Sequence, residues 1–176
     1  MSRAAIVVML ALMASGCQTW EAQGGTADLT LSGDLPWTTA PQITTSIEVD
    51  GPNQAEASVL CSVKADGSYS IAAYTAELEE LKRVRAVVRI PNFAGTSSYG
   101  SDEDPSPAYA ELTLREGGEN SWASDGAEFP CTGWVDLENI EGEFTCTGIT
   151  GKTPAAEEPD GPIDFDLSYL CGPGTN

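Results

Sequence analysis

The sequence predicts an all-β fold, an antiparallel β-sandwich of about nine strands with two disulfides. Three observations lead to this prediction. Apolar and polar residues alternate along most of the chain, clusters of Pro, Gly, Asn and Asp interrupt the alternation at short intervals, and four of the five cysteines lie beyond the N-terminal segment. Alternation with a period of two buries one face of each strand, and short strands separated by regular turns are typical of sandwiches.

The alternating segments follow one another from residue 27 to residue 171. Their inward-facing residues are predicted to be Ala27, Leu29 and Leu31; Ile43, Thr45, Ile47 and Val49; Val59, Cys61 and Val63; Tyr69, Ile71 and Ala73; Val84, Ala86, Val88 and Ile90; and Ala108, Ala110, Leu112 and Leu114. A hairpin over 131–149 and a last strand over 163–171 complete the set. Turn-forming residues separate the segments, and Asp66-Gly67 between two alternating runs is a strong hairpin signal.

The segment 75–88 contains two competing patterns. Its acidic residues come first and its basic residues last, which suits a helix dipole, and apolar residues recur at helical spacing. From Arg83 onwards, however, arginines alternate with apolar residues as in a strand. We expect one helical turn over 76–81, followed by a strand from Arg83. Half of the eight cations gather here, at Lys82, Arg83, Arg85 and Arg89, and we expect them to pair with the acidic surface rather than with an external anion.

Residues 131–149 are predicted to form a hairpin in which Cys131 lies opposite Cys146. In that register the inner face holds only apolar residues and glycines, with Phe144 filling the space above Gly133. A shift of one residue would bring a carboxylate onto the inner face, so the hydrophobic pattern specifies the register. We therefore expect a cross-strand disulfide between these two cysteines.

The remaining pair is Cys61 and Cys171, and each of these cysteines shares a face with apolar residues of its own segment. A buried disulfide between them would close almost the whole domain into one loop. The chain-entropy model gives about 4–5 kcal/mol of stabilisation for such a loop. The rival pairings lack comparable support from a strand register, and zinc binding is disfavoured because the chain has no CxxC pair and no histidine.

The first 17 residues have the layout of an export signal. Arg3 precedes an apolar run over residues 4–14, which is too short to span a bilayer. The run Leu12-Met13-Ala14-Ser15-Gly16-Cys17 resembles the lipobox of bacterial lipoproteins. This resemblance implies cleavage after residue 16 and attachment of fatty acyl chains such as palmitate to Cys17. The odd number of cysteines agrees with it, because a lipidated Cys17 leaves four that can pair. The alternative is an ordinary secretory signal with Cys17 merely near its cleavage site.

The domain organisation follows from this interpretation. Residues 1–16 are predicted to be a lipoprotein signal peptide, residues 17–26 the lipidated cysteine with a small polar tether, and residues 27–176 a single domain. The predicted location is the bacterial cell envelope, outside the cytoplasm. In a Gram-negative cell, Gln18 after the lipidated cysteine would permit sorting to the outer membrane, by resemblance to known lipoproteins.

Charge and composition exclude several classes of function. The chain has 27 acidic and 8 basic residues and a formal net charge of −19, which argues against binding to nucleic acid or an electrostatic hold on anionic lipid. With no histidine, every Ser-His-Asp, Cys-His and His-ligated metal site is excluded. No pair of carboxylates stands out among so many acids. We therefore expect no enzymatic activity and no obligatory cofactor.

Two candidate binding features remain. The acidic run Asp102-Glu103-Asp104 is a candidate calcium site, although its spacing is not that of an EF-hand and an acidic surface loop is the favoured interpretation. Trp134 lies on the otherwise polar outer face of the 131–149 hairpin, where it is a candidate for stacking against a carbohydrate. Packing of Trp134 beneath a loop or a second sheet is the favoured alternative.

The turn of the 131–149 hairpin is expected at Glu138-Asn139, because Asn tolerates a positive φ.

The overall layout also resembles that of one known family. The lipobox and tether are followed by Val59-Leu60-Cys61, by Gly67-Ser68-Tyr69-Ser70-Ile71, and by a last apolar strand ending in Cys171. Over about residues 57–171 this layout is similar to the mycobacterial 19 kDa lipoprotein antigen family. That resemblance implies a surface-displayed lipoprotein without known catalysis, and the additional cysteines at 131 and 146 depart from the family layout.

The predicted function is therefore that of a lipid-anchored, non-enzymatic envelope protein with a binding, adhesion or coat role. We expect its partner to be a protein or a carbohydrate. Two alternatives stay open: a carrier that holds an apolar ligand between its sheets, and a calcium-dependent carbohydrate-binding module.

Overall fold

The structure, a computed structural model, describes residues 19–50, 56–76, 83–101, 106–116, 120–124, 129–156 and 158–172. As predicted, these residues form an all-β, antiparallel fold. The strands are β1 (Trp20–Gln23), β2 (Gly25–Gly33), β3 (Gln42–Val49), β4 (Ala57–Val63), β5 (Tyr69–Thr75), β6 (Arg83–Ile90), β7 (Ser97–Tyr99), β8 (Ala108–Glu116), β9 (Asn120–Ser124), β10 (Phe129–Asp136), β11 (Glu141–Ile149), β12 (Gly151–Lys152) and β13 (Ile163–Cys171).

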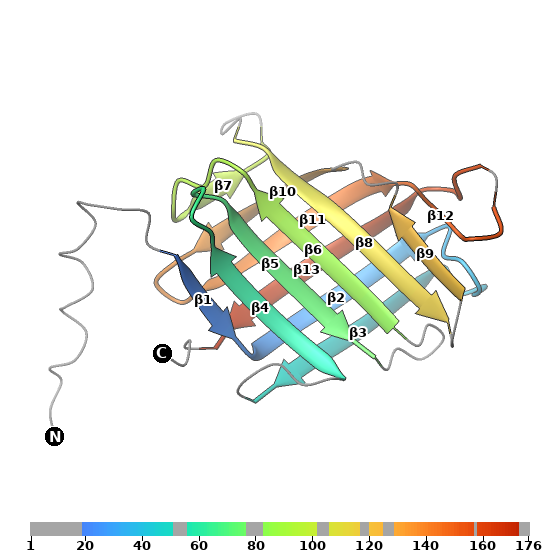
Figure 1. Ribbon diagram of the computed structural model, residues 1–176, viewed down its shortest axis with the longest axis horizontal. Helices are drawn as coiled ribbons and strands as arrows, with labels where there is room; N and C mark the ends of the chain where they lie inside the picture. Colours follow the sequence, from blue (N-terminus) through green and yellow to red (C-terminus); the bar gives the residue numbers. More distant parts are fainter. Residues whose placement is uncertain are drawn as a thin grey trace, which may run out of the picture.

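All the strands belong to one continuous sheet that folds back on itself. Its order is β1-β4-β5-β6-β8-β10-β11-β13-β2-β3. Figure 1 shows β1, β4, β5, β6, β8 and β9 in front, called here the front layer, while β10, β11, β13, β2 and β3 cross behind them as the back layer. The sheet turns from one layer to the other at β10, which pairs with β8 on one side and with β11 on the other.

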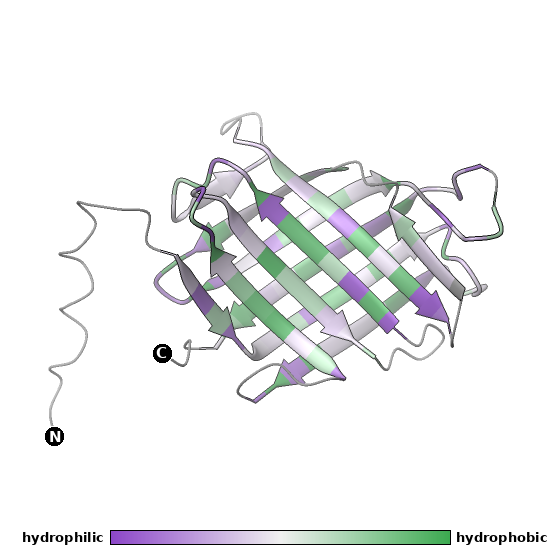
Figure 2. Cartoon of the chain, in the orientation of Figure 1, coloured by the Kyte–Doolittle hydropathy of each residue, from purple (hydrophilic) through white to green (hydrophobic). Residues whose placement is uncertain are grey.

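The core fills the space between the two layers. Apolar side chains alternate along each strand, as the hydropathy colours of Figure 2 show, and those facing inward are buried. The largest fully buried side chains include Trp122, Tyr69, Tyr99, Phe144 and Phe165. Burial of apolar area on this scale is the main force that holds the layers together.

Four short strands were not expected from the sequence: β1, β7, β9 and β12. They explain why the sheet has thirteen strands rather than about nine. The interpretation of residues 17–26 as a tether is partly wrong, because Trp20–Gln23 forms β1 against β4 and Gly25 begins β2. Trp20 packs its ring 6.2 Å from that of Tyr69, so β1 is fixed to the body of the domain from its first residue.

The 131–149 hairpin has the predicted register. Cys131 lies opposite Cys146, and Gly133 lies opposite Phe144, whose ring fills the space that a Cβ at position 133 would need. The turn differs from the expectation, because the positive φ falls on Ile140 (56°) and not on an asparagine. The carbonyl oxygen of Ile140 accepts a hydrogen bond from the Cys171 amide at 2.9 Å, and this bond holds the turn in that conformation.

Both predicted disulfides are present. Cys61–Cys171 joins β4 of the front layer to β13 of the back layer and spans 110 residues of sequence. Cys131–Cys146 joins the neighbouring strands β10 and β11 and spans 15 residues. The first disulfide therefore ties the two layers together, whereas the second joins two neighbouring strands of the back layer.

The N-terminal strand passes from the front layer to the back layer at Gly24 and Gly25, beside the interlayer disulfide. Both glycines have positive φ values, 85° and 107°. A Cβ on Gly25 would lie 2.0 Å from the carbonyl oxygen of Leu170, so only glycine fits there. The Gly24 amide donates to the Val59 carbonyl at 2.9 Å, and its own carbonyl accepts from the Gly172 amide at 2.9 Å. This corner is thus hydrogen-bonded to both layers.

The strand expected from Arg83 is confirmed as β6. The helical turn expected over 76–81 falls almost entirely outside the described residues. In the described part of the chain, no helix is long and apolar enough to cross a membrane.

Candidate functional site: the acidic face

The outer face of the back layer, called here the acidic face, is lined by polar and charged side chains from β10, β11, β13, β2 and β3. Each of these strands points every second residue outward. The charged residues on this face are Asp28, Glu48, Asp136, Glu141, Glu143, Asp164 and Asp166. Among its described residues the face has no Lys or Arg, so all of its charge has one sign.

The two large apolar side chains described as exposed both lie on this face. Trp134 is 40% exposed and Leu170 is 44% exposed. The favoured expectation that Trp134 packs under a loop or a second sheet is therefore wrong. In the sheet register, Trp134 of β10 lies opposite Glu143 of β11. Leu170 of β13 lies opposite Glu141, which is also on β11. The two glutamates thus stand between the two apolar side chains.

A shallow pocket of about 240 Å³ lies between Trp134 and Leu170, called here the Trp134–Leu170 pocket. Glu141 and Glu143 line it together with hydroxyl-bearing residues and Asp28. Its floor contains Gly142, where a Cβ would lie 2.6 Å from the hydroxyl of the underlying Tyr169. That Cβ would point into the core, so the glycine leaves room for the Tyr169 ring beneath the sheet. On the outer face, the pocket has an aromatic wall on one side, an aliphatic wall on the other and carboxylates between them.

The hydrogen bonds described for the carboxylates of the acidic face come from neutral donors. The Thr145 hydroxyl donates to Asp166 at 2.7 Å, and the Gly148 amide donates to Asp164 at 2.7 Å. Beside the pocket, the Asn139 side-chain amide donates to Glu141 at 3.2 Å. Such bonds orient the carboxylates without neutralising them, so the face keeps its negative charge.

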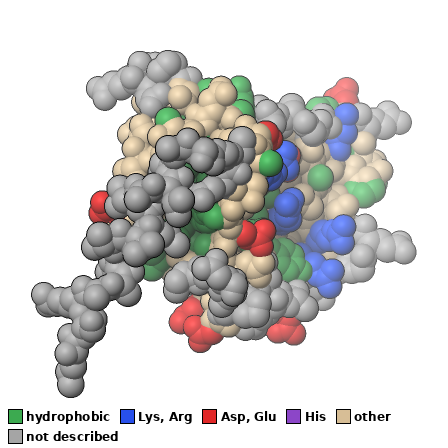
Figure 3. Space-filling model, turned by 60° about the vertical axis from the view of Figure 1, so that its left-hand side comes forward, with side chains coloured by type: hydrophobic (Ala, Val, Ile, Leu, Met, Phe, Trp, Pro, Cys, Tyr) green, Lys and Arg blue, Asp and Glu red, His purple; other side chains and the backbone are tan. Residues whose placement is uncertain are grey.

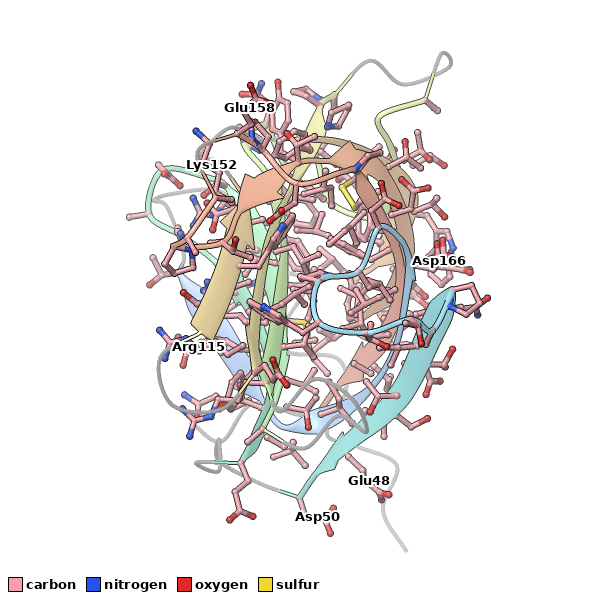
Figure 4. All side chains as sticks on the ribbon, turned by 90° about the vertical axis from the view of Figure 1, so that its right-hand side faces the viewer. Glu48, Asp50, Arg115, Lys152, Glu158 and Asp166 are labelled. Atoms are coloured by element: carbon pink, nitrogen blue, oxygen red, sulfur yellow. A yellow bond between two sulfur atoms is a disulfide. The ribbon has the colours of Figure 1, made fainter. Side chains whose placement is uncertain are left out.

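The outer face of the front layer has the opposite character. It contains the arginine patch, formed by Arg83, Arg85 and Arg89 of β6 and Arg115 of β8. Figure 3 shows the basic side chains gathered on this side of the molecule. In Figure 4, which looks at the end of the molecule, Arg115 and Asp166 project to opposite sides, with the core between them.

The cations of β6 were expected to pair with acidic side chains, and one arginine of the patch does so. Arg89 forms an ion pair with Glu111 at 3.1 Å. For Arg83, Arg85 and Arg115 no ion pair is found within the described residues, and Arg83 lies directly opposite Arg115 in the register. Lys82 lies outside the described residues.

Four other aromatic side chains do not extend the exposed surface of Trp134. Trp122 and Tyr99 are completely buried, and Tyr109 is on the front layer. Trp37 belongs to the connection between β2 and β3 and has a positive φ of 63°, which is strained for a bulky residue. That connection borders a second pocket of about 420 Å³, whose lining includes Asp34 and Asp160.

The clear shifts in pKa all have structural causes. Hydrogen bonds from the Ser68 side chain and amide, 2.6 and 2.9 Å long, lower the pKa of Asp66 in the turn between β4 and β5. Burial raises the pKa of Tyr69 and of Tyr169, whose hydroxyls meet at 3.0 Å inside the core. The two tyrosine hydroxyls thus face each other in the core, and Asp66 lies in an exposed turn.

Two predicted sites lie outside the described residues: the lipidation site Cys17 and the candidate calcium site Asp102-Glu103-Asp104. Elsewhere, in the residues that the structure does describe, no group of three or more Cys, Asp or Glu side chains is placed to hold a metal ion.

Of the residues around this pocket, Trp134 was predicted from the sequence as a candidate binding residue, whereas Leu170, Glu141 and Glu143 were missed. The signal for all three was available. Residue 170 falls on the outward positions of the last strand, and the predicted hairpin register sets Glu143 opposite Trp134.

Comparison with known proteins gives no match: no protein-family model, curated protein or solved structure is similar to this chain. The resemblances to bacterial lipoproteins and to the 19 kDa lipoprotein antigen family remain predictions from the sequence.

Proposed function

We propose that this chain is a lipid-anchored, non-enzymatic lipoprotein of the bacterial cell envelope that binds a partner through its acidic face. The observation that carries the proposal is the Trp134–Leu170 pocket, where large apolar side chains are exposed next to uncompensated carboxylates. Exposed apolar groups grouped together on an otherwise polar surface mark interaction sites. Trp is also among the residues that contribute most to binding free energy.

The anchoring is supported by the lipobox and by the position of β1. Trp20 is three residues after Cys17, and three residues of extended chain span about 10 Å. The corner at Gly24 and Gly25 then fixes this strand to both layers. A lipidated Cys17 would therefore hold the domain close to the membrane by one end. Two buried disulfides agree with an oxidising, extracytoplasmic compartment.

A binding role rather than catalysis is supported by the chemistry of the described surface. The chain lacks histidine, and the described groups with shifted pKa values serve a turn and the core. Perturbed titratable groups in clefts are the usual sign of an active site.

Mass spectrometry of the mature protein from membranes tests the anchoring. We expect the first residue to be Cys17 bearing acyl chains, with the other four cysteines paired. A Cys17→Ser variant should leave the membrane fraction, while a Gln18→Ser variant stays there as the matched control. Recovery of wild-type protein with an unmodified Cys17 from the soluble fraction would contradict the proposal.

A carbohydrate is the second candidate ligand for the acidic face. An exposed tryptophan offers a flat apolar surface to a sugar ring, and the neighbouring Glu141, Glu143 and Ser168 offer hydrogen-bonding groups. If the calcium-dependent form of this hypothesis holds, calcium should raise the midpoint of thermal unfolding. Asp102→Asn with Asp104→Asn should then abolish the shift. An unchanged midpoint in the presence of calcium removes that form of the hypothesis.

The carrier hypothesis requires an apolar cavity between the layers. In the described part of the core, that space is occupied by Trp122, Tyr69, Tyr99 and Phe144, each completely buried. This packing favours surface binding over internal binding.

A further inference from the structure

We propose that the Trp134–Leu170 pocket binds cationic amphipathic peptide segments, with a lysine or arginine side chain between Trp134 and Leu170. This inference rests on the proposed binding role of the acidic face and names the chemical class of its partner. It follows from the shape of the pocket, from the distribution of charge over the molecule and from the position of the pocket near the N-terminal corner.

The shape of the pocket suits a long side chain with a charged end. Its walls are the indole of Trp134 and the aliphatic side chain of Leu170, with Glu141 and Glu143 in the row between them. The face of an indole attracts a cation, while the methylene groups of Lys or Arg pack on apolar surface. A carboxylate beside the bound cation adds a charge-assisted hydrogen bond. A neutral sugar would use the indole but would leave the negative charge of both glutamates unbalanced.

Among the described residues, no Lys or Arg of this chain lines the pocket. The described Lys and Arg residues lie on β6 and β8 of the front layer, in the turn between β4 and β5, and on β12, which pairs with β9 of the front layer. We therefore expect the cation to come from a partner molecule. A net charge of −19 draws cations towards the protein and repels anionic partners.

The position of the pocket explains why the partner is amphipathic. Leu170 pairs with Thr26, next to the glycine corner through which β1 leads back towards residue 17. A protein lipidated at Cys17 would hold the pocket about one short strand away from the membrane surface. Cationic amphipathic segments gather at such surfaces, because they bind both anionic headgroups and the hydrocarbon boundary. The apolar residues of such a segment would meet Leu170 while its cations meet the glutamates.

Binding can be measured with the full chain in phosphatidylcholine nanodiscs, with empty nanodiscs as the blank. The probe is a fluorescently labelled octapeptide of alternating Lys and Leu, followed by fluorescence anisotropy. We expect saturable binding, a loss of about tenfold in affinity for Trp134→Ala, and a loss of at least that size for Glu141→Gln with Glu143→Gln. Raising the salt concentration should weaken binding, because exposed charges are screened.

The matched control is Asp164→Asn with Asp166→Asn, which removes the same charge from the same face at a distance from the pocket. This control should lose less than about threefold in affinity, since its effect is limited to the long-range field. Equal losses for the two double variants would overturn the proposal in favour of non-specific attraction. Equal binding of an alternating Glu-Leu octapeptide, or no effect of Trp134→Ala, would also overturn it. The same titration with the Cys17→Ser protein in solution separates the two proposals, because failure of the anchoring test with intact peptide binding in solution would contradict the lipoprotein proposal alone.

Discussion

The front and back layers have the same inner chemistry and opposite outer chemistries. Inside, both present alternating apolar side chains that are almost completely buried. Outside, the front layer displays the arginine patch, whereas the back layer displays carboxylates around the Trp134–Leu170 pocket. Folding requires only the inner pattern, because surface charges contribute little to stability. The fold therefore does not require the separation of the outer charges, and this separation agrees with the binding role proposed for the acidic face.

The two disulfides are expected to differ in how much they stabilise the fold, because only one of them joins the two layers. Replacing the interlayer pair, Cys61→Ser with Cys171→Ser, should lower the free energy of unfolding by about 4–5 kcal/mol, because the disulfide closes a loop of 110 residues. Replacing the pair between β10 and β11, Cys131→Ser with Cys146→Ser, should lower it by about 3 kcal/mol, since its loop spans 15 residues. Urea unfolding of both double variants measures the difference. A larger loss for the shorter loop would contradict this ranking.

The parts of the fold that the sequence predicted are those specified by local patterns. The 131–149 hairpin could be placed in register because only one pairing keeps carboxylates off the inner face and sets Gly133 beneath Phe144. The pairing of Cys61 with Cys171 could then be predicted, because the hairpin register already pairs Cys131 with Cys146.

The parts that were missed depend on partners distant in the sequence. Strands β1, β7, β9 and β12 are two to five residues long, too short for alternation to be visible, and they form where a neighbouring strand offers a free edge. The exposure of Trp134 could not be predicted either, because it depends on which other strands cover the hairpin. The opposition of the two outer faces depends likewise on which strands share a layer.

A second prediction concerns the contact of the two layers inside the core. Tyr69 of the front layer and Tyr169 of the back layer share a hydrogen bond of 3.0 Å between their hydroxyls. Tyr169→Phe should destabilise the protein by about 1–3 kcal/mol, because it leaves the Tyr69 hydroxyl buried with one partner fewer. The double variant with Tyr69→Phe should cost less than the sum of the two single variants. Chemical denaturation of all four proteins gives this coupling, and strict additivity would show that the two hydroxyls act independently.

The same tyrosines predict how stability depends on pH. Burial raises the pKa of both above the unfolded value of about 10. Above about pH 10 the unfolded chain therefore loses these protons while the folded chain retains them, and stability falls as the pH rises. Below that pH the contribution is fully present. Unfolding curves between pH 8 and 11 should show this decline, and it should be weaker in the double phenylalanine variant.

The smallest expected effects come from the charges of the front layer. Glu111→Gln removes the ion pair with Arg89, whose side chains are 38% (Arg89) and 31% (Glu111) exposed, and should cost less than about 1 kcal/mol. Arg115→Gln should have the opposite sign and stabilise the protein by a few tenths of a kcal/mol, because it removes a like charge from directly opposite Arg83. Thermal unfolding at low and high salt measures both, and salt should diminish each effect. A stabilising Arg115→Gln would mean that the arginine patch is kept at the expense of the fold. A destabilising one would instead assign Arg115 a structural partner and weaken the contrast between the two faces.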